Sequence, residues 1–444
     1  MSNRDFLLRG ARRLRRAAPS LVFLSGLGSL PGVGRAQDWV RSHFEAPSAP
    51  SAQTAPAPVA STGGLHDGSP GLNPLQARVG RTANVGGLAL SLGVDAALEY
   101  NDNVRVEPVG QSGVIASAGL RFDAAYQLTR LQELSLKGQI GERIPLSGPG
   151  RRQQLLSVAP DSALRFNLWV ASIRISPFFK YRRQLDPILS PVVNRTEILD
   201  QRAVTLGVQA DLPMHESDLQ LLVFRERRSQ LGEAALAQTS WNDVGAIRYR
   251  RALSKTNQMS ADVAVVEAHS EGGPSQRSNF VTFGVHDDWR LSPAMALRVG
   301  AGVARNRYVN SRVAADDAKV TTPFLVCSFD HSPRENLSYV LRYHQSTQEG
   351  VSTNFYRLRE LSLTPRYLLT TAVTLDLMGS YQWVRESGPT GERGTRWTAG
   401  AGLGYNVTAD LNVRLAFDRV AKQSNLPLRA YRQNRLTLSV QLEF

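Results

Sequence analysis

The sequence has a single cysteine, Cys327, and no apolar run long enough to form a membrane-spanning helix. One thiol excludes an intramolecular disulfide, so the fold cannot depend on a disulfide framework. A spanning helix needs about 20 consecutive apolar residues, and the mean hydropathy of this chain is −0.24. These absences exclude a helical membrane protein. They leave a membrane β-barrel open, because strands that alternate polar and apolar residues have low average hydropathy.

The sequence also lacks the compact motifs of common catalytic and metal sites. None of the seven histidines has the His-Glu-x-x-His spacing of a zinc site, and no Gly-x-Ser-x-Gly segment is present. The glycines of segment 400–404 are not followed by a helical pattern, which a phosphate-binding loop requires. We therefore predict that the protein is not an enzyme and binds no metal or cofactor. The alternative is a barrel-embedded hydrolase whose serine and histidine come from distant strands.

The charge balance does not point to nucleic acid. The formal net charge is +14, but residues 1–36 contribute +6 of it through seven arginines and one aspartate. The remaining +8 is spread over many segments and forms no basic block. Because a nucleic-acid-binding face requires clustered positive charge, we predict no nucleic-acid partner.

The N-terminal segment has the organisation of an export signal. The basic stretch 12–16 precedes the apolar stretch 20–30, and small residues at positions 34 and 36 suit cleavage after Ala36. We interpret residues 1–36 as a cleaved secretory signal peptide. Residues 37–80 are rich in Pro, Ala and Ser and contain few large apolar side chains. Such a segment cannot bury enough surface to offset the entropy of ordering, which predicts a disordered periplasmic tail.

The C-terminal segment 436–444 alternates without exception, with apolar residues at even positions and polar residues at odd ones. A strand turns successive side chains to opposite faces, so this segment has one apolar and one polar face. An amphipathic strand that ends on an aromatic residue, behind an export signal, is typical of outer-membrane barrels. The sequence therefore predicts that Phe444 is the C-terminal signal for the barrel-assembly machinery. It also predicts the outer membrane of a Gram-negative bacterium, with its lipid, as the location.

The same alternation repeats across residues 85–444. Segments of roughly 10 to 15 residues are separated by connectors that are alternately short and long. This pattern predicts an all-β fold, a transmembrane antiparallel up-and-down β-barrel of about 18 strands, within a range of 16–20. The alternatives are a soluble β-sandwich, whose strands would be shorter, and a β-solenoid, which would need a fixed repeat. The aromatic residues near predicted strand ends suggest interfacial girdles; they are Tyr100, Tyr126, Trp169, Trp289, Tyr381, Trp383, Trp397 and Phe444.

If the apolar faces meet lipid, the opposite parity of each segment lines the lumen. Arginine on the lipid face near the midplane costs about 2–4 kcal/mol, which fixes the parity. The lumen candidates are Arg165, Arg174, Lys180, Arg182, Arg248, Arg250, Arg298, Arg342, Arg414 and Arg435. Such a wall favours anionic or hydroxyl-rich solutes, because a guanidinium offers several donors in a fixed fork. The alternative is that these cations pair with lumen carboxylates and only hold the wall together.

One short motif suggests a family. Segment 99–104 reads Glu-Tyr-Asn-Asp-Asn-Val, and its core of Tyr100, Asn101, Asp102 and Asn103 resembles the Tyr-(Asn/Asp)-Asp-Asn-(Val/Ile) segment of the beta-barrel porin-2 family. This resemblance implies an outer-membrane barrel linked to exopolysaccharide biosynthesis. From the residues alone the motif predicts a polar turn, because Asn and Asp tolerate left-handed φ and bond their own backbone. A cation held by Glu99 and Asp102 is the alternative.

The leading functional hypothesis is a porin-like barrel that passes or exports a polar solute through an Arg-lined lumen. The solute would be an exopolysaccharide or another anionic molecule. A second hypothesis is a non-conducting scaffold with a plugged lumen, which docks partners of envelope or polysaccharide assembly. The embedded hydrolase is the third.

Overall fold

The structure of the chain, a computed structural model, describes residues 83–85, 87–104, 108–148, 155–159, 162–184, 200–231, 238–271, 276–309, 319–349, 354–388 and 391–444. The predicted signal peptide, residues 1–36, and the predicted tail, residues 37–80, lie outside these ranges. No helix in the described ranges is both long enough and apolar enough to cross a membrane.

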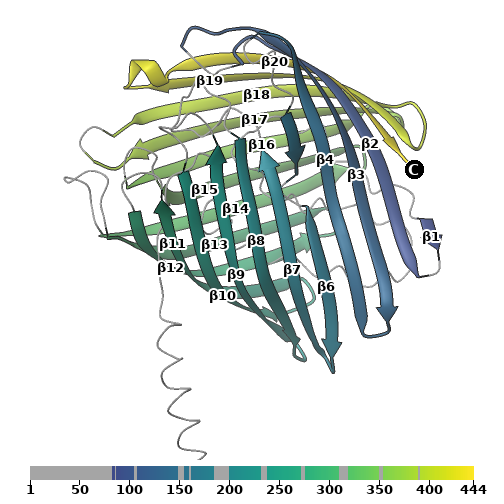
Figure 1. Ribbon diagram of the computed structural model, residues 1–444, viewed down its shortest axis with the longest axis vertical. Coiled ribbons are helices and arrows are strands. Elements are labelled where there is room, and N and C mark those ends of the chain that lie inside the picture. Colours follow the sequence, from purple (N-terminus) through teal and green to yellow (C-terminus); the bar gives the residue numbers. More distant parts are fainter. Residues whose placement is uncertain are drawn as a thin grey trace, which may run out of the picture.

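The described residues form one antiparallel sheet that closes on itself (Figure 1). Its strands are β1 (Ala83–Val85), β2 (Leu88–Asn101), β3 (Gly113–Thr129), β4 (Gln132–Ser147), β5 (Leu155–Val158), β6 (Ala163–Val170), β7 (Ile173–Gln184), β8 (Asp200–Pro213), β9 (Ser217–Leu231), β10 (Gln238–Ala252), β11 (Asn257–Glu271), β12 (Gln276–Ser292), β13 (Met295–Tyr308), β14 (Lys319–Arg334), β15 (Leu337–Glu349), β16 (Phe355–Leu368), β17 (Val373–Glu386), β18 (Arg393–Asn406), β19 (Leu411–Ser424) and β20 (Tyr431–Glu443). A single 3-10 turn, η2 (Pro427–Arg429), lies between β19 and β20. Closure joins β20 to β2, from Gly93 opposite Glu443 to Asn101 opposite Arg435.

The barrel has 18 strand positions, although the chain forms 20 strand segments. Both β5 and β6 lie between β4 and β7, so they are two parts of one interrupted strand. The three-residue β1 pairs with β2 at Leu88–Leu90, beyond the point where β20 ends opposite Gly93. It therefore continues the line of β20 and adds no position. The predicted fold class, an antiparallel up-and-down barrel of about 18 strands, is confirmed.

The two ends of the barrel differ in their connections. At the end that carries Phe444, which we call the short-turn end, eight connections of two to four residues join consecutive strands. Thr370 and Thr408 show why such turns are tight. Each hydroxyl accepts one hydrogen bond from a backbone N–H of its own four-residue turn and one from the N–H of the first residue of the next strand. The connections at the opposite, long-loop end are mostly longer, which is the asymmetry typical of outer-membrane barrels.

The faces of the barrel are inverted relative to a water-soluble protein. Outward apolar side chains stay exposed, with Leu206 at 65% and Val223 at 63%, whereas inward Ser176, Gln209 and Asn242 are fully buried. An apolar exterior of this kind suits a hydrocarbon solvent, and closure satisfies the backbone groups that lipid cannot bond. Most of the aromatic residues listed above share the outward parity; Trp169 does not. It lies opposite Arg174 on the inward parity, so its assignment to an outer girdle is corrected.

Part of the inner wall is apolar, which the sequence analysis did not predict. Eight buried side chains with inward parity form one cluster across β7–β12; they are Phe178, Leu222, Phe224, Val244, Ala246, Ala264, Val266 and Phe280. Gly207 lies between two of them, directly opposite Phe178 on one side and Phe224 on the other. The two rings approach across the glycine to a centroid separation of 6.3 Å.

A side chain at position 207 would disturb this packing. A Cβ there would lie 2.3 Å from the Cβ of Phe224 and 2.7 Å from the Val223 carbonyl oxygen. We expect Gly207→Ala to destabilise the barrel by about 1–3 kcal/mol, because overpacking forces backbone shifts. The matched control is Gly245→Ala, where a Cβ meets nothing within 4 Å. Urea unfolding in lipid vesicles measures both variants, and equal stability of the two would contradict the prediction.

Candidate functional site

All ten lumen candidates share the parity of the buried polar side chains on their strands. Arg165 lies on β6, with Arg174, Lys180 and Arg182 on β7 and Arg248 and Arg250 on β10. Arg298 lies on β13, Arg342 on β15, Arg414 on β19 and Arg435 on β20. They differ in solvent exposure, since Arg174 and Arg248 are buried while Arg298, near the short-turn end, is exposed. Their role in solute passage remains a prediction.

At least five of the ten cations form ion pairs with carboxylates on the inner wall. The N–O distances are 2.6 Å for Arg174–Asp211, 2.9 Å for Arg250–Asp218, 2.6 Å for Arg414–Asp376 and 3.4 Å for Arg435–Asp418; Arg298 pairs with Asp288. Four of these pairs join residues directly opposite each other on neighbouring strands. These contacts agree with the alternative in which cation–carboxylate pairs hold the wall together.

Arg414 reaches its carboxylate across an intervening strand. Asp376 lies on β17 and Arg414 on β19, with Gly402 of β18 between them. A Cβ at Gly402 would lie 2.6 Å from a terminal guanidinium nitrogen of Arg414. The missing side chain therefore leaves the space in which the guanidinium crosses the strand.

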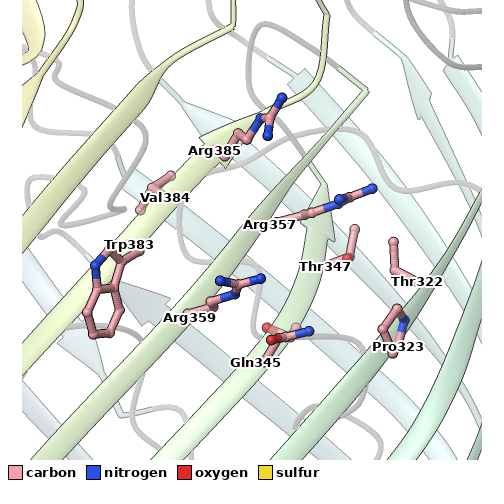
Figure 2. Close-up of a pocket in the computed structure, with 10 residues that line it drawn as sticks. Thr322, Pro323, Gln345, Thr347, Arg357, Arg359, Trp383, Val384 and Arg385 are labelled. Carbon is pink, nitrogen blue, oxygen red and sulfur yellow. The ribbon is translucent and has the colours of Figure 1, made fainter.

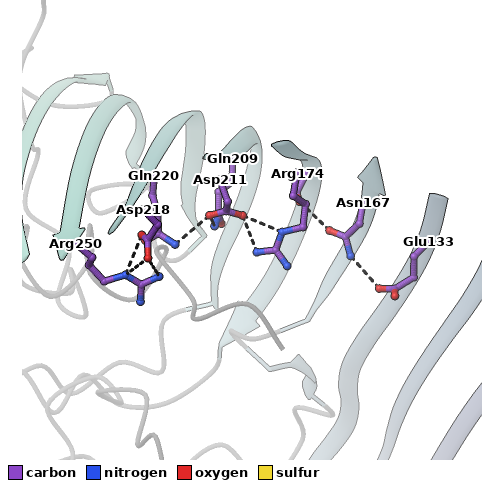
Figure 3. A network of polar contacts seen from close by, with 9 residues as sticks. Glu133, Asn167, Arg174, Gln209, Asp211, Asp218, Gln220 and Arg250 are labelled. Carbon is purple, nitrogen blue, oxygen red and sulfur yellow. Dashed lines mark hydrogen bonds and ion pairs between the residues drawn. The ribbon is translucent and has the colours of Figure 1, made fainter. Parts of the chain in front are cut away.

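A polar network lies near the short-turn end, across β4–β10 (Figure 3). Asp211 is its centre. One carboxylate oxygen accepts from Arg174 Nε at 2.9 Å, and the other accepts from the amides of Gln209 at 2.8 Å and Gln220 at 3.0 Å. The network continues beside it, where Asn167 donates to Glu133 at 2.9 Å and accepts from Ser176 at 2.7 Å. Because its charged groups and its donors have partners, this network stiffens the wall at the short-turn end.

Three of the remaining candidates have surroundings that the structure defines. Arg165 and Lys180 lie over the Phe178 ring, at 5.9 Å and 5.6 Å from its centroid. Arg342 is half-buried, and it makes no ion pair or side-chain hydrogen bond within the part of the chain that the structure describes. The residues directly opposite it are Ser328 on β14 and Ser362 on β16. Neither serine can neutralise the guanidinium, so Arg342 presents its charge and its donors to the interior.

The motif at the end of β2 joins the two ends of the barrel sequence. The Asn103 N–H donates to the Asn101 side chain at 2.9 Å, which is the polar turn predicted from the residues. The two Asp102 oxygens accept from the backbone N–H and the side-chain amide of Asn434, at 2.6 Å and 2.5 Å. Asn103 donates to the Arg432 carbonyl at 2.8 Å. The motif thus fastens β2 to β20 at the long-loop end of the closing seam.

The alternative of a cation at this motif finds no support in the geometry. Both Asp102 oxygens are turned to Asn434, and Glu99 accepts from the Asn101 amide at 3.2 Å. Among the described residues, no group of three or more His, Cys, Asp or Glu side chains could hold a metal ion. Tyr100 points outward and is 48% exposed, so it takes no part in the turn.

Phe444 lies at the short-turn end of the seam. Its N–H donates to the Leu92 carbonyl at 2.9 Å, and its ring is 59% exposed. The residue therefore extends the closing ladder and leaves its side chain accessible. Recognition by the barrel-assembly machinery remains a prediction.

The sequence analysis missed the carboxylates that pair with the lumen candidates. Asp211, Asp218, Asp376 and Asp418 all have the inward parity of their strands, a signal that was present in the sequence. It also missed a group of arginines on the outer wall, which we describe below.

No protein-family model matches the chain, and no curated protein matches it in sequence. Solved outer-membrane proteins share its architecture. The outer membrane protein OpdK of Pseudomonas aeruginosa is 13% identical, covers 80% of this chain and 99% of its own, and gives a TM-score of 0.47. A BenF-like porin from Pseudomonas fluorescens Pf-5 is 12% identical over 81% and 100%, with a TM-score of 0.48. The siderophore receptor PirA of Pseudomonas aeruginosa is 9% identical over 80% of both chains, with a TM-score of 0.45. At these identities the likeness concerns the fold alone.

Proposed function

We propose that the chain is an outer-membrane channel for a polar, anionic or hydroxyl-rich solute, with an exopolysaccharide as the leading candidate. The observation that carries the proposal is Arg342, a half-buried inward cation within a closed barrel, opposite two serines and in no ion pair with any described residue. A guanidinium in this position offers its donors to carboxylates or hydroxyl groups that pass along β15. The location, the link to the beta-barrel porin-2 family and the contact with the assembly machinery belong to the same proposal.

The inner wall around Arg342 supports a pathway on this side of the barrel. Ser362, Glu360 and Arg342 itself are half-buried, and Thr364 and Arg366 are exposed. On β7–β12, by contrast, the inward cluster is at most 4% exposed. A solute that follows water would therefore pass along β15 and β16 rather than along the apolar part of the wall.

Arg342→Ala tests the proposed pathway. In planar bilayers under a salt gradient, we expect the anion-to-cation permeability ratio to fall about two- to tenfold, because an uncompensated positive charge leaves the wall. An acidic polysaccharide should block the wild-type current more strongly than the variant current. The matched control is Arg357→Ala, whose guanidinium lies on the outer wall of β16 and should leave the ratio unchanged. An unchanged ratio in Arg342→Ala would remove Arg342 from the pathway.

The second candidate function is a non-conducting scaffold for envelope assembly. It is favoured by the inward apolar cluster, because residues such as Leu222 and Phe280, at 0% and 1% exposure, do not face open water. The same bilayer recording separates the two functions. Discrete current steps support the channel, and a folded, inserted and silent barrel supports the scaffold.

A further inference from the structure

The outer wall carries an uncompensated basic cluster at its long-loop end. Arg357 and Arg359 on β16, Arg385 on β17 and Arg393 on β18 are all exposed on the outward parity. We call these four residues the outer arginine cluster. Within the described residues, none of their guanidinium groups makes a hydrogen bond or an ion pair.

The register brings these charges directly together. Arg357 lies opposite Arg385, and Arg385 lies opposite Arg393, so three like charges form a row across three neighbouring strands. Neighbouring strands are about 4.8 Å apart, and like charges directly opposite each other destabilise a sheet. None of the outward side chains described on β16–β18 is acidic. Among the side chains that the structure describes, the row therefore has no counter-charge, which leaves it free to bind an external anion.

Some outward arginines on other strands are neutralised, whereas others, such as Arg305 and Arg307 on β13, are also exposed and make no ion pair within the described residues. Arg225 on β9 pairs with Asp243 at 2.6 Å, and Arg277 on β12 pairs with Glu267 at 2.9 Å. These residues also lie toward the long-loop ends of their strands. What distinguishes the β16–β18 wall is that three arginines without acidic partners lie directly opposite one another on neighbouring strands.

A hollow of about 320 Å³ lies beside the cluster (Figure 2). Arg357 and Arg359 of β16 line it together with Arg385 and Trp383 of the adjacent strand β17. Pro323 forms its opposite side, near the point where the β14–β15 ladder begins at Leu325. Proline cannot donate to a ladder, which is consistent with strands that separate here and leave the hollow.

The cluster lies directly above the apolar exterior. Following β16 toward the short-turn end, the next outward residues after Arg359 are Leu361 and Leu363, at 42% and 41% exposure. On β17, Trp383 and then Tyr381 follow Arg385, with ring centroids 4.6 Å apart. Aromatic residues mark the boundary between hydrocarbon and headgroups. The arginines therefore lie at headgroup height, while a ligand's acyl chains would contact the leucines.

We propose that the outer arginine cluster binds the phosphate groups of a phosphorylated glycolipid in the outer leaflet. Guanidinium groups bind phosphate through paired, charge-assisted hydrogen bonds, and the row across β16–β18 offers several forks to a headgroup that carries more than one phosphate. The proposal depends on the orientation of the barrel in an outer membrane. It does not depend on conductance, so a silent barrel would leave it unaffected.

The test compares Arg357→Gln/Arg359→Gln/Arg385→Gln with wild type. Folded protein in mild detergent is titrated with diphosphorylated lipid A, and bound lipid is counted by native mass spectrometry. We expect wild type to retain lipid A and the triple variant to bind it at least about tenfold more weakly, because several charge-assisted bonds are lost. Dephosphorylated lipid A should bind wild type as weakly as the triple variant binds the diphosphorylated form.

Two controls keep the result specific. The variant Arg225→Gln/Arg227→Gln/Arg277→Gln removes the same charge from outward positions on β9 and β12 and should bind lipid A as wild type does. An Arg→Lys triple at positions 357, 359 and 385 keeps the charge but lacks the forked guanidinium, so it should bind lipid A with intermediate strength. It replaces the glutamine triple as the test if that variant does not fold. The proposal is overturned if the glutamine triple binds like wild type, if the control triple loses as much, or if wild type binds dephosphorylated lipid A as tightly as the diphosphorylated form.

Discussion

Glu392→Gln should destabilise the barrel by about 3–5 kcal/mol, because it leaves a buried cation without its partner. Glu392 is fully buried in the connection between β17 and β18, and its carboxylate lies 2.8 Å from Lys422 Nζ, whose side chain is 1% exposed. The second Glu392 oxygen lies 3.0 Å from Arg429, which also pairs with Glu386 at 3.1 Å. These contacts fasten the β17–β18 connection to β19 and η2.

The cause can be separated from a general loss of packing by a double-mutant cycle. The double variant Glu392→Gln/Lys422→Met removes both members of the pair, so we expect it to be more stable than Glu392→Gln alone. Unfolding by urea in lipid vesicles, followed by tryptophan fluorescence, gives the free energies. Arg393→Gln, an exposed neighbour, is the control and should change stability by less than about 0.5 kcal/mol. Additive losses in the double variant would show that the ion pair does not determine the effect.

The architecture was predictable because alternation is a local property. Each strand such as β18 or β20 carries its own inside–outside pattern, so the number of strands and the direction of each side chain follow from the sequence. The pair Asp288–Arg298 was not predictable in the same way. The two-residue turn at 293–294 pairs Ser292 with Met295, which in strict register would put Asp288 opposite Val299, and a bulge between Arg290 and Ser292 moves it opposite Arg298.

The other pairings depend on register across long connections. Arg174 meets Asp211 across residues 185–199, and Arg250 meets Asp218 across residues 232–237. A connection of that length does not fix which residues lie opposite each other, so these carboxylates could not be assigned from sequence.

The apolar part of the inner wall has a signal in the sequence that an analysis based on strict alternation overlooks. Segment 221–224 reads Leu-Leu-Val-Phe, which is apolar at both parities. A continuous apolar run is typical of a strand whose two faces both avoid water. The outer arginine cluster is similar, since Arg357 and Arg359 share the parity of Leu361 and Leu363. Parity could have placed these arginines on the outer face, although the sequence analysis did not use it, and only the register shows that they lie beside Arg385 and Arg393.

The closing seam gives the second large effect. We expect Asp102→Ala to destabilise the barrel by about 2–3 kcal/mol. The Asp102 carboxylate accepts two hydrogen bonds from Asn434, which lies more than 300 residues further along the chain, and both donors would lose their acceptor. Gln433 reinforces this contact by donating to the Asn103 carbonyl at 2.9 Å, and it is 1% exposed. The matched control is Asp123→Ala on β3, an exposed aspartate with no ion pair or side-chain hydrogen bond among the described residues.

A local measurement distinguishes a seam contact from a general effect on folding. In Asp102→Ala, amide hydrogen exchange should rise first in β2 and β20, since the seam at Tyr100–Leu436 then lacks its fastening at the long-loop end. The ladder between β9 and β10, on a distant part of the wall, should keep wild-type protection. Asp102→Asn retains one acceptor oxygen and should fall between wild type and Asp102→Ala. Uniform exchange across both ladders, or a loss equal to that of Asp123→Ala, would mean that the motif does not hold the barrel closed.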